Sequence, residues 1–262
     1  MSPNLPITFP LGSEEKLLRV STTEGYNLVE YTSAPDNRYT PEFIDAYLEA
    51  LAFIRIHLEP KVLITTSVFP KFFSNGLDFE RAIVTEGFMP DRYYRLMRAV
   101  MEFPQPTIAV VNGHAFAAGF MIAACHDFRI MNPNKGYLCM NEVEFGAPIL
   151  PPMMSIYRVK FGTAITQKIT LQAHRFTAKE ALANKLIDGL GGMEEGIALA
   201  EKLSKFANAV SYAAIRKELL KEVITDTLSF EQDTERLTQR QELEDDYYEK
   251  KGAEIEKKLA KL

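Results

Sequence analysis

The chain carries KFFSNGLDF at residues 71–79, PTIAVVNGHAFAAG at residues 106–119 and MNEVEFG at residues 140–146. Each of the first two passes from a β-branched or aromatic run into a glycine-containing turn, where a helix can begin. The third places a carboxylate, Glu142, in a short segment after an expected strand. Two turns that aim backbone N–H groups at one point, with one base beside them, are the minimal parts for forming and quenching an enolate.

Strands are expected before both turns. One is expected at residues 62–68, and the near-continuous apolar run at 107–111 is typical of a strand covered on both faces. The small residues at 115–125 predict a buried helix that approaches a sheet closely. The strand–turn–helix segments 62–79 and 107–124 begin about 45 residues apart. We interpret them as a weak internal repeat of stacked ββα units.

The flanking sequence supplies further helix signals. Thr40 and Pro41 predict a helix start, as N-cap and first helical residue. Another helix is expected at residues 91–101, and TAKE at residues 177–180 fits a capping box. The C-terminal part of the chain has a mainly helical pattern and no cluster of chemical groups. Packing or subunit contact is therefore its expected role.

Composition excludes several classes of function. The 262 residues carry 30 basic and 35 acidic side chains, a net charge of −5, with no strongly basic stripe. We therefore expect no nucleic-acid partner. No apolar run is long enough to predict a membrane span. Cys125 and Cys139 lack CxxC spacing, and the four histidines form no metal-binding pattern, so no disulfide framework or metal site is predicted.

The residues alone leave alternatives open at each turn. The first turn fits a plain strand-to-helix connection as well as a site in which the Leu77 N–H is free to donate. In the second, free N–H groups in the first turn of a helix would favour a bound anion. Glu142 competes with Glu144 because residues two apart on an extended segment share a face. Taken alone, Glu142 would be interpreted as an exposed loop carboxylate.

Together the three stretches resemble the enoyl-CoA hydratase/isomerase (crotonase) superfamily. Within it they are most similar to the peroxisomal monofunctional Δ3,Δ2-enoyl-CoA isomerases. The resemblance is closest over residues 71–146 and continues more faintly to about residue 200. It implies an α/β fold with a crotonase-like stacked ββα spiral core and active site at residues 1–200. Residues 201–262 would then be a helical C-terminal oligomerisation region that makes subunit contacts.

Site residues follow from the resemblance position by position. It implies an oxyanion hole formed by the backbone N–H groups of Leu77 and Ala118, with Glu142 as the general base. Residues that bind the substrate and its CoA part are then expected among Phe73, Asn75 and Gly76.

One position departs from the hydratases of this superfamily. Hydratases carry a second glutamate where this chain has Met121. Methionine cannot position a water molecule or relay its protons, so hydration is disfavoured and a proton shift by a single base remains. Such a shift requires no metal and no cofactor, because CoA is part of the substrate.

The implied function is a Δ3,Δ2-enoyl-CoA isomerase of fatty-acid β-oxidation. The alternatives are another crotonase-type acyl-CoA enzyme, such as an enoyl-CoA hydratase or dienoyl-CoA isomerase, and a non-catalytic acyl-CoA-binding oligomer. The resemblance also implies a homotrimer or hexamer. The terminal Ala260, Lys261 and Leu262 are a close variant of the Ser-Lys-Leu address. They predict an import receptor as partner and the peroxisome as location.

Overall fold

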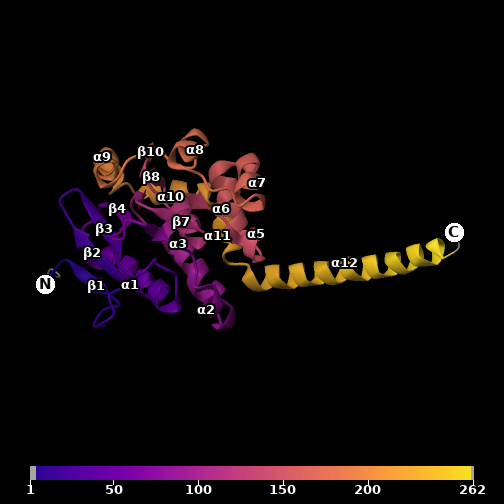
Figure 1. Cartoon of the computed structure of the whole chain (residues 1–262). Helices are drawn as coiled ribbons and strands as arrows, with labels where there is room; N and C mark the ends of the chain where they lie inside the picture. Colours follow the sequence, from indigo (N-terminus) through magenta and orange to yellow (C-terminus); the bar gives the residue numbers. More distant parts are fainter. Residues whose placement is uncertain (1–3, 261–262) are drawn as a thin grey trace. The chain divides into compact units, whose positions relative to one another are not determined.

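The computed structural model describes residues 4–260 of the chain. Contacts divide the chain into two compact units, one ending at Thr227 and one beginning at Leu228. The second unit consists largely of one long helix, α12 (Phe230–Leu259), whereas the first holds all the strands (Figure 1). Among the described residues, no helix is both long and apolar enough to cross a membrane.

The strands of the first unit are β1 (Ile7–Phe9), β2 (Leu18–Thr22), β3 (Tyr26–Tyr31), β4 (Val62–Ser67), β5 (Phe72–Ser74), β6 (Thr107–Val111), β7 (His114–Phe116), β8 (Phe128–Met131), β9 (Leu138–Cys139) and β10 (Gly189–Leu190). Its first helices are α1 (Pro41–His57), α2 (Phe79–Val84), the π-helical turn η1 (Phe88–Tyr93), α3 (Tyr94–Met101), α4 (Ala118–Cys125) and α5 (Glu142–Phe145). The later helices are α6 (Pro151–Phe161), α7 (Thr163–Leu171), α8 (Ala178–Ala183), α9 (Met193–Leu203), the 3₁₀ turn η2 (Ser204–Phe206), α10 (Val210–Leu219) and α11 (Lys221–Asp226).

Two sheets organise this unit. The larger has the order β1-β2-β3-β4-β6-β8-β10, antiparallel as far as β3 and parallel beyond it. The smaller has the order β5-β7-β9, and all its strands are parallel. Along the chain the strands alternate between the sheets, as β4–β5, β6–β7 and β8–β9, and a helix follows each pair. The expected stacked ββα core and its internal repeat are therefore confirmed.

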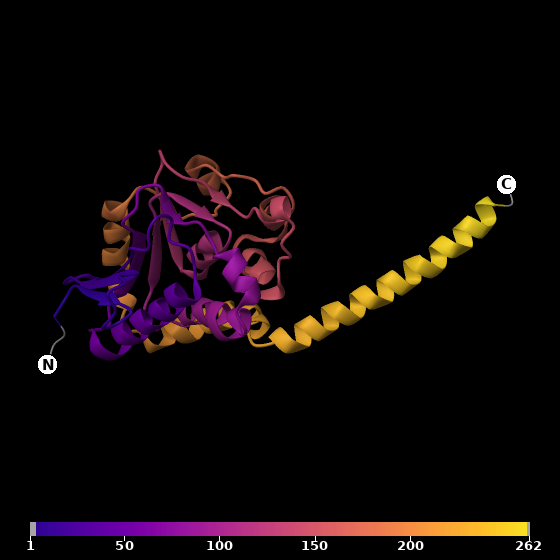
Figure 2. The same ribbon diagram turned by 60° about the horizontal axis from the view of Figure 1, so that its bottom comes forward.

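Strand β4 is buried along its whole length because its side chains alternate between two helical layers. Val62 and Ile64 belong to a core cluster with Ala200 of α9, which lies beside the strands in Figure 2. On the opposite face, the Thr65 hydroxyl lies 3.2 Å from the hydroxyl of Tyr47 in α1. Burial on both faces is the usual environment of a parallel strand.

Two expected helices differ at their starts from what their sequences indicate. The helix expected at residues 115–125 begins at Ala118, and His114–Phe116 form β7 instead. This strand pairs with β5 on one side and β9 on the other, so partners remote in sequence override the local helix preference of alanine. The helix expected at 91–101 starts as the π-helical turn η1 and becomes α-helical at Tyr94.

Candidate active site

Three residues expected to carry chemistry follow the ends of neighbouring strands. Leu77 comes shortly after β5, Ala118 after β7 and Glu142 after β9. Because β5, β7 and β9 are adjacent and parallel, their carboxyl ends lie at the same edge of the small sheet. The fold therefore brings the three residues to one edge, although 65 positions separate Leu77 from Glu142 in the sequence.

The first two turns are in direct contact at this edge. A Cβ atom added to Gly76 would lie 2.9 Å from the Ala117 Cβ and 3.4 Å from the Ala118 nitrogen. Gly76 also has a φ of 86°, which residues with a side chain rarely adopt. Glycine is therefore required here both by the backbone conformation and by the close approach of the second turn.

Both turns end in backbone amides that donate to no protein atom within residues 4–260. Beside Leu77, the Gly76 carbonyl and the Asp78 N–H bond to Tyr39, but the Leu77 N–H does not. Ala118 is the first residue of α4, where an N–H group has no intrahelical acceptor. Ala117 before it has a φ of 49°, an uncommon value for alanine that stores backbone strain. The edge thus carries two unused donors.

Glu142 is a buried carboxylate at this same edge. It is the first residue of α5, its exposed fraction is only 7%, and its Oε2 has no hydrogen-bond partner among the described residues. Burial raises the pKa of Glu142 to about 7, although hydrogen bonds from the backbone of Glu142 and Asn141 oppose the shift. A carboxyl group with this pKa takes up and releases a proton with similar ease at neutral pH.

Glu144, the alternative base, lies in a different environment. The expectation that residues 142 and 144 lie on one extended segment is wrong, because α5 is helical from Glu142 to Phe145. Residues two apart on a helix point in nearly opposite directions. The side chain of Glu144 is 51% exposed and lies 3.8 Å from Arg175. The helix therefore distinguishes Glu142 from Glu144, which the alternation of side chains along an extended segment could not do.

The residues expected to bind CoA have mixed environments. Phe73 is fully buried, with its ring 5.2 Å from that of Tyr31, so its side chain belongs to the aromatic core. Asn75 is half-buried and ties the first turn to Asp36: its backbone N–H donates to the Asp36 carbonyl at 2.9 Å, and its side chain donates to Oδ2 at 2.8 Å. Contact of these residues or of Gly76 with substrate stays a prediction.

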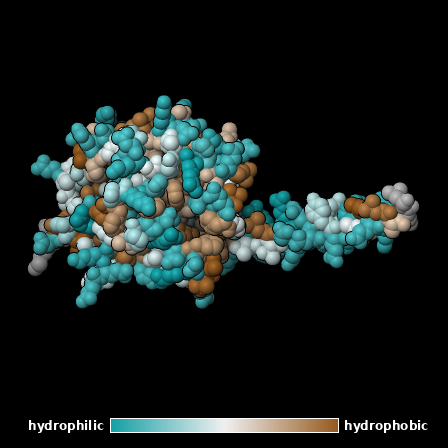
Figure 3. All heavy atoms as spheres, in the orientation of Figure 1, coloured by the Kyte–Doolittle hydropathy of each residue, from teal (hydrophilic) through white to brown (hydrophobic). Residues whose placement is uncertain are grey.

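Exposed apolar side chains extend outward from the same edge. Phe79 in α2 packs edge-on against Phe145 in α5, with ring centroids 5.7 Å apart. Both rings are about half exposed, and Ile83 and Val84 of α2 are more exposed still. Figure 3 shows a brown area at the lower edge of the first unit, where Figure 1 labels α2. An apolar surface therefore begins near both Leu77 and Glu142.

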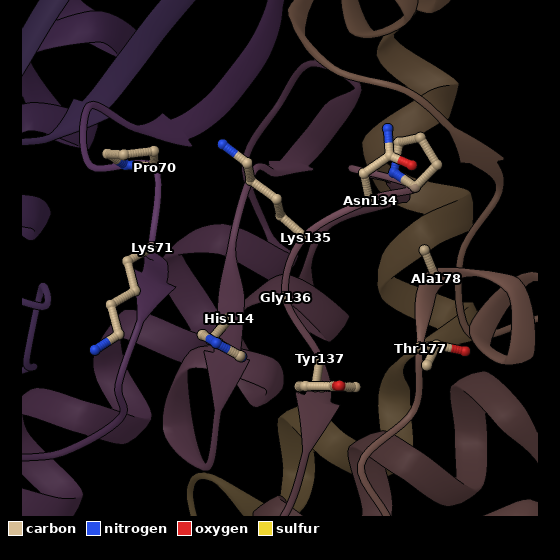
Figure 4. A pocket seen from close by; sticks show the side chains of 10 residues that line it. Pro70, Lys71, His114, Asn134, Lys135, Gly136, Tyr137, Thr177 and Ala178 are labelled. Carbon is tan, nitrogen blue, oxygen red and sulfur yellow. The ribbon is translucent and has the colours of Figure 1, made fainter.

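A separate hollow lies at the amino ends of the same three strands. It encloses about 490 Å³ and is lined by Lys71, His114 and Tyr137, which stand at the starts of β5, β7 and β9 (Figure 4). His114 lies between the other two, and burial, followed by the charges of Lys71 and Arg175, lowers its pKa. Because Glu142 follows the opposite strand ends, this hollow is not part of the site at the carboxyl edge.

Two tyrosines near Glu142 were not anticipated from the sequence. Tyr93 and Tyr157 are both fully buried, and the charge of Glu142 acts on both hydroxyl groups. Each lies in a segment whose pattern favours a core helix, where a tyrosine is usually a packing residue. The structure adds one indication, because Tyr93 ends the π-helical turn η1 and such turns often mark functional sites.

Comparison with known proteins identifies the family. The model of the enoyl-CoA hydratase/isomerase family matches residues 31–259. The chain belongs to this family. Among family members, enoyl-CoA delta isomerase 3 of Arabidopsis thaliana is 30% identical over 211 residues, 75% of this chain and 89% of that protein. The peroxisomal enoyl-CoA delta isomerase 2 of the same plant is 31% identical over 215 residues, with the same coverage.

Family members that are named hydratases are also similar to this chain. A putative enoyl-CoA hydratase of Thermus thermophilus is 30% identical over 217 residues, 77% of this chain and 83% of that protein. A crystal structure of a probable enoyl-CoA hydratase of Mycobacterium tuberculosis has a TM-score of 0.73 at 20% identity, covering 89% of this chain and 99% of that one. This likeness establishes the crotonase fold, but the fold alone does not separate isomerases from hydratases in this family.

Proposed function

We propose that this chain is a Δ3,Δ2-enoyl-CoA isomerase that moves a double bond from position 3 to trans-2 of an acyl-CoA. The proposal rests on one observation: a buried carboxylate with a pKa of about 7 shares a sheet edge with two unused backbone amides. A single base and an anion-stabilising pair of donors suffice for this reaction. The Arabidopsis relatives named enoyl-CoA delta isomerase support the same assignment.

The reaction assigns a role to each group. Glu142 removes a proton from C2 of the 3-enoyl thioester, and the resulting dienolate carries its charge largely on the thioester oxygen. The N–H groups of Leu77 and Ala118 donate to that oxygen, and such preorganised donors act most strongly where water is excluded. Glu142 then returns the proton to C4. The protonated and ionised forms of Glu142 are both required, which suits a pKa close to neutrality.

Met121 supports isomerisation over hydration. Its side chain is buried, and its Sδ lies 3.3 Å from the Tyr93 hydroxyl, so no carboxylate occupies this position on α4. Adding water across a double bond calls for a second group to hold the water and relay a proton. General acid–base groups typically contribute about 10²–10⁴ in rate.

The test is to compare two assays on the purified protein. Conversion of 3-hexenoyl-CoA to trans-2-hexenoyl-CoA is expected to be at least about a hundredfold faster than hydration of crotonyl-CoA, because the second relay group is lacking. Both reactions are followed by absorbance of the conjugated thioester. Fast hydration would favour the hydratase alternative, and tight acyl-CoA binding without any turnover would favour the non-catalytic one.

The pH dependence of the isomerase follows from Glu142. The free enzyme must hold Glu142 ionised to accept the C2 proton, and burial places its pKa at about 7. We therefore expect kcat/KM to fall as the pH drops below 7, about tenfold per unit, and to level off above pH 8. A profile that stays flat down to about pH 5 would mean that the base has an ordinary carboxylate pKa.

Substrate tail, assembly and location are further parts of the proposal. The acyl tail is expected to leave the site along the apolar surface of Phe79 and Phe145. Helix α12 exposes Leu243 and Tyr248, which we expect to make subunit contacts.

Two Arabidopsis relatives are named peroxisomal, in agreement with the terminal Ala-Lys-Leu. Of this tripeptide, Lys261 and Leu262 lie outside the described residues. Sedimentation, and import of a fusion with and without the tripeptide, would test these points.

A further inference from the structure

The segment at residues 36–39, between β3 and α1, lies directly against the first turn. Within it, Tyr39 forms an isolated parallel bridge with Leu77. The Tyr39 N–H donates to the Gly76 carbonyl at 2.9 Å, and the Tyr39 carbonyl accepts from the Asp78 N–H at 3.3 Å. In a planar trans peptide the C=O and N–H bonds point in opposite directions. The bond to the Gly76 carbonyl therefore directs the Leu77 N–H away from Tyr39.

A buried asparagine anchors this segment. Asn37 is fully buried and has a φ of 52°, a left-handed value that asparagine adopts more readily than most residues. Its Nδ2 donates to the Ser67 hydroxyl at 2.7 Å and to the Phe73 carbonyl at 3.0 Å. Both hydrogens of the side-chain amide are thus used, and they join the segment to the end of β4 and to β5.

The Ser74 hydroxyl connects this anchor to the turn. Ser74 is the last residue of β5 and is fully buried. Its Oγ donates to the Asn37 carbonyl at 2.7 Å and accepts from the Gly76 N–H at 3.2 Å. The backbone amides of residues 75, 76 and 78 therefore all donate to an oxygen, whereas that of Leu77 has no acceptor among the described residues.

We propose that Asn37 and Ser74 are positioning residues that hold the Leu77 N–H in the direction required by the thioester oxygen. This inference rests on the proposed function, in which that N–H is one of two donors. Gly76 has a φ of 86° and no side chain, so the peptide before Leu77 can rotate unless its neighbours restrain it. The two buried side chains supply this restraint through the backbone of the turn, without touching the substrate.

The first measurement is kcat and KM for 3-hexenoyl-CoA in two variants. Asn37→Gly removes the side-chain amide, but it keeps the carbonyl that accepts from Ser74 and a residue type that adopts a φ of 52° without strain. We expect its kcat to fall by about 10²-fold, the scale of a misplaced catalytic group, with KM changed much less. Ser74→Ala removes one hydroxyl and is expected to lower kcat by about tenfold.

A binding measurement separates positioning from a purely structural role. Acetoacetyl-CoA can bind as an enolate, whose negative oxygen resembles that of the dienolate, whereas hexanoyl-CoA offers only a neutral carbonyl oxygen. Both variants are expected to bind acetoacetyl-CoA more weakly, by about the factor lost in kcat, and hexanoyl-CoA with nearly wild-type affinity. Side chains that only stabilised the fold would change neither affinity in the folded protein.

Asn27→Ala is the matched control. Asn27 is an equally buried asparagine near the start of β3, whereas Asn37 follows the end of that strand. Its Nδ2 donates to the Glu59 carbonyl at 3.1 Å, and its Oδ1 accepts from the Thr22 hydroxyl at 2.7 Å. Because these contacts lie away from the first turn, the control is expected to lower the melting temperature but to keep the wild-type kcat and acetoacetyl-CoA affinity.

The results also separate this inference from the proposed function. If the wild type isomerises 3-hexenoyl-CoA and both folded variants keep its kcat and its acetoacetyl-CoA affinity, the positioning role is overturned. If thermal unfolding shows that Asn37→Gly does not fold, Ser74→Ala decides by the same two measurements. A wild type that binds the enolate but does not isomerise, with enolate binding weakened in the variants, would overturn the proposed reaction and leave the positioning role intact.

Discussion

Replacing Glu142 with glutamine is expected to lower kcat for 3-hexenoyl-CoA isomerisation by about 10⁴-fold. The carboxylate performs both proton transfers in the proposed reaction, and an amide performs neither. The protein should remain folded, because glutamine has nearly the same shape and Glu142 makes no ion pair among the described residues. Activity is measured by the conversion assay, and the fold by circular dichroism.

The same variant is expected to be more stable than the wild type at high pH. The pKa of Glu142 is about 7 in the folded chain against 4.5 for an ordinary glutamate, so the folded state binds the proton more tightly. Stability of the wild type therefore falls as the pH rises from 4.5 to 7 and stays constant above. At pH 8 the gain in Glu142→Gln should reach about 3 kcal/mol, and near pH 5 only about 1 kcal/mol.

Glu144→Gln is the matched control for both measurements. Glu144 lies two residues away on the same short helix, yet its side chain is half exposed. Its replacement should leave kcat within about twofold and stability within about 0.5 kcal/mol of the wild type. If Glu144→Gln loses activity while Glu142→Gln keeps it, the assignment of the base is wrong.

Replacing Ala118 with proline is expected to lower kcat by about 10²–10³-fold, the usual cost of losing one oxyanion donor. A side-chain change cannot ordinarily delete a main-chain N–H, but proline does. Ala118 is the first residue of α4, a position where proline fits without loss of an intrahelical bond. Ala117 before it is not in the right-handed helical region that a following proline disfavours.

Ala118→Ser is the control for this substitution, because it keeps the amide and adds only a hydroxyl group. It should retain most of the activity, whereas the proline variant should lose kcat with an unchanged melting temperature. A folded proline variant with wild-type kcat would exclude the Ala118 N–H as a donor. The Leu77 N–H cannot be tested in the same way, because Leu77 precedes α2 and lies in no helix.

Several local features could be predicted because short-range chemistry determines them. The Thr40 side chain caps α1 and Pro41 is its first residue, as the sequence indicates. The capping box of Thr177 and Glu180 is present, and the apolar run at 107–111 is strand β6. Each of these signals acts within a few residues, through a side-chain cap, a fixed φ or a continuous apolar run.

Other features depended on partners that the sequence does not place. Residues His114–Phe116 become a strand only because β5 and β9 lie on either side. Glu142 is buried, but its apolar sequence neighbours Val143 and Phe145 are about half exposed, so they do not account for its burial. The groups that sense its charge, Tyr93 and Tyr157, come from η1 and α6. Long-range packing therefore determines the pKa of Glu142, and local pattern could not supply it.

In the small sheet, the residues that form the strands are different from the residues proposed to take part in the reaction. Its strands are two or three residues long, and the proposed chemical groups all follow their carboxyl ends. The strand backbones hydrogen-bond to one another, so substitutions past the strand ends leave those ladders in place, except at positions such as Gly76 where the two turns are in direct contact. Laboratory evolution toward a different thioester reaction would thus need to alter only a handful of loop positions.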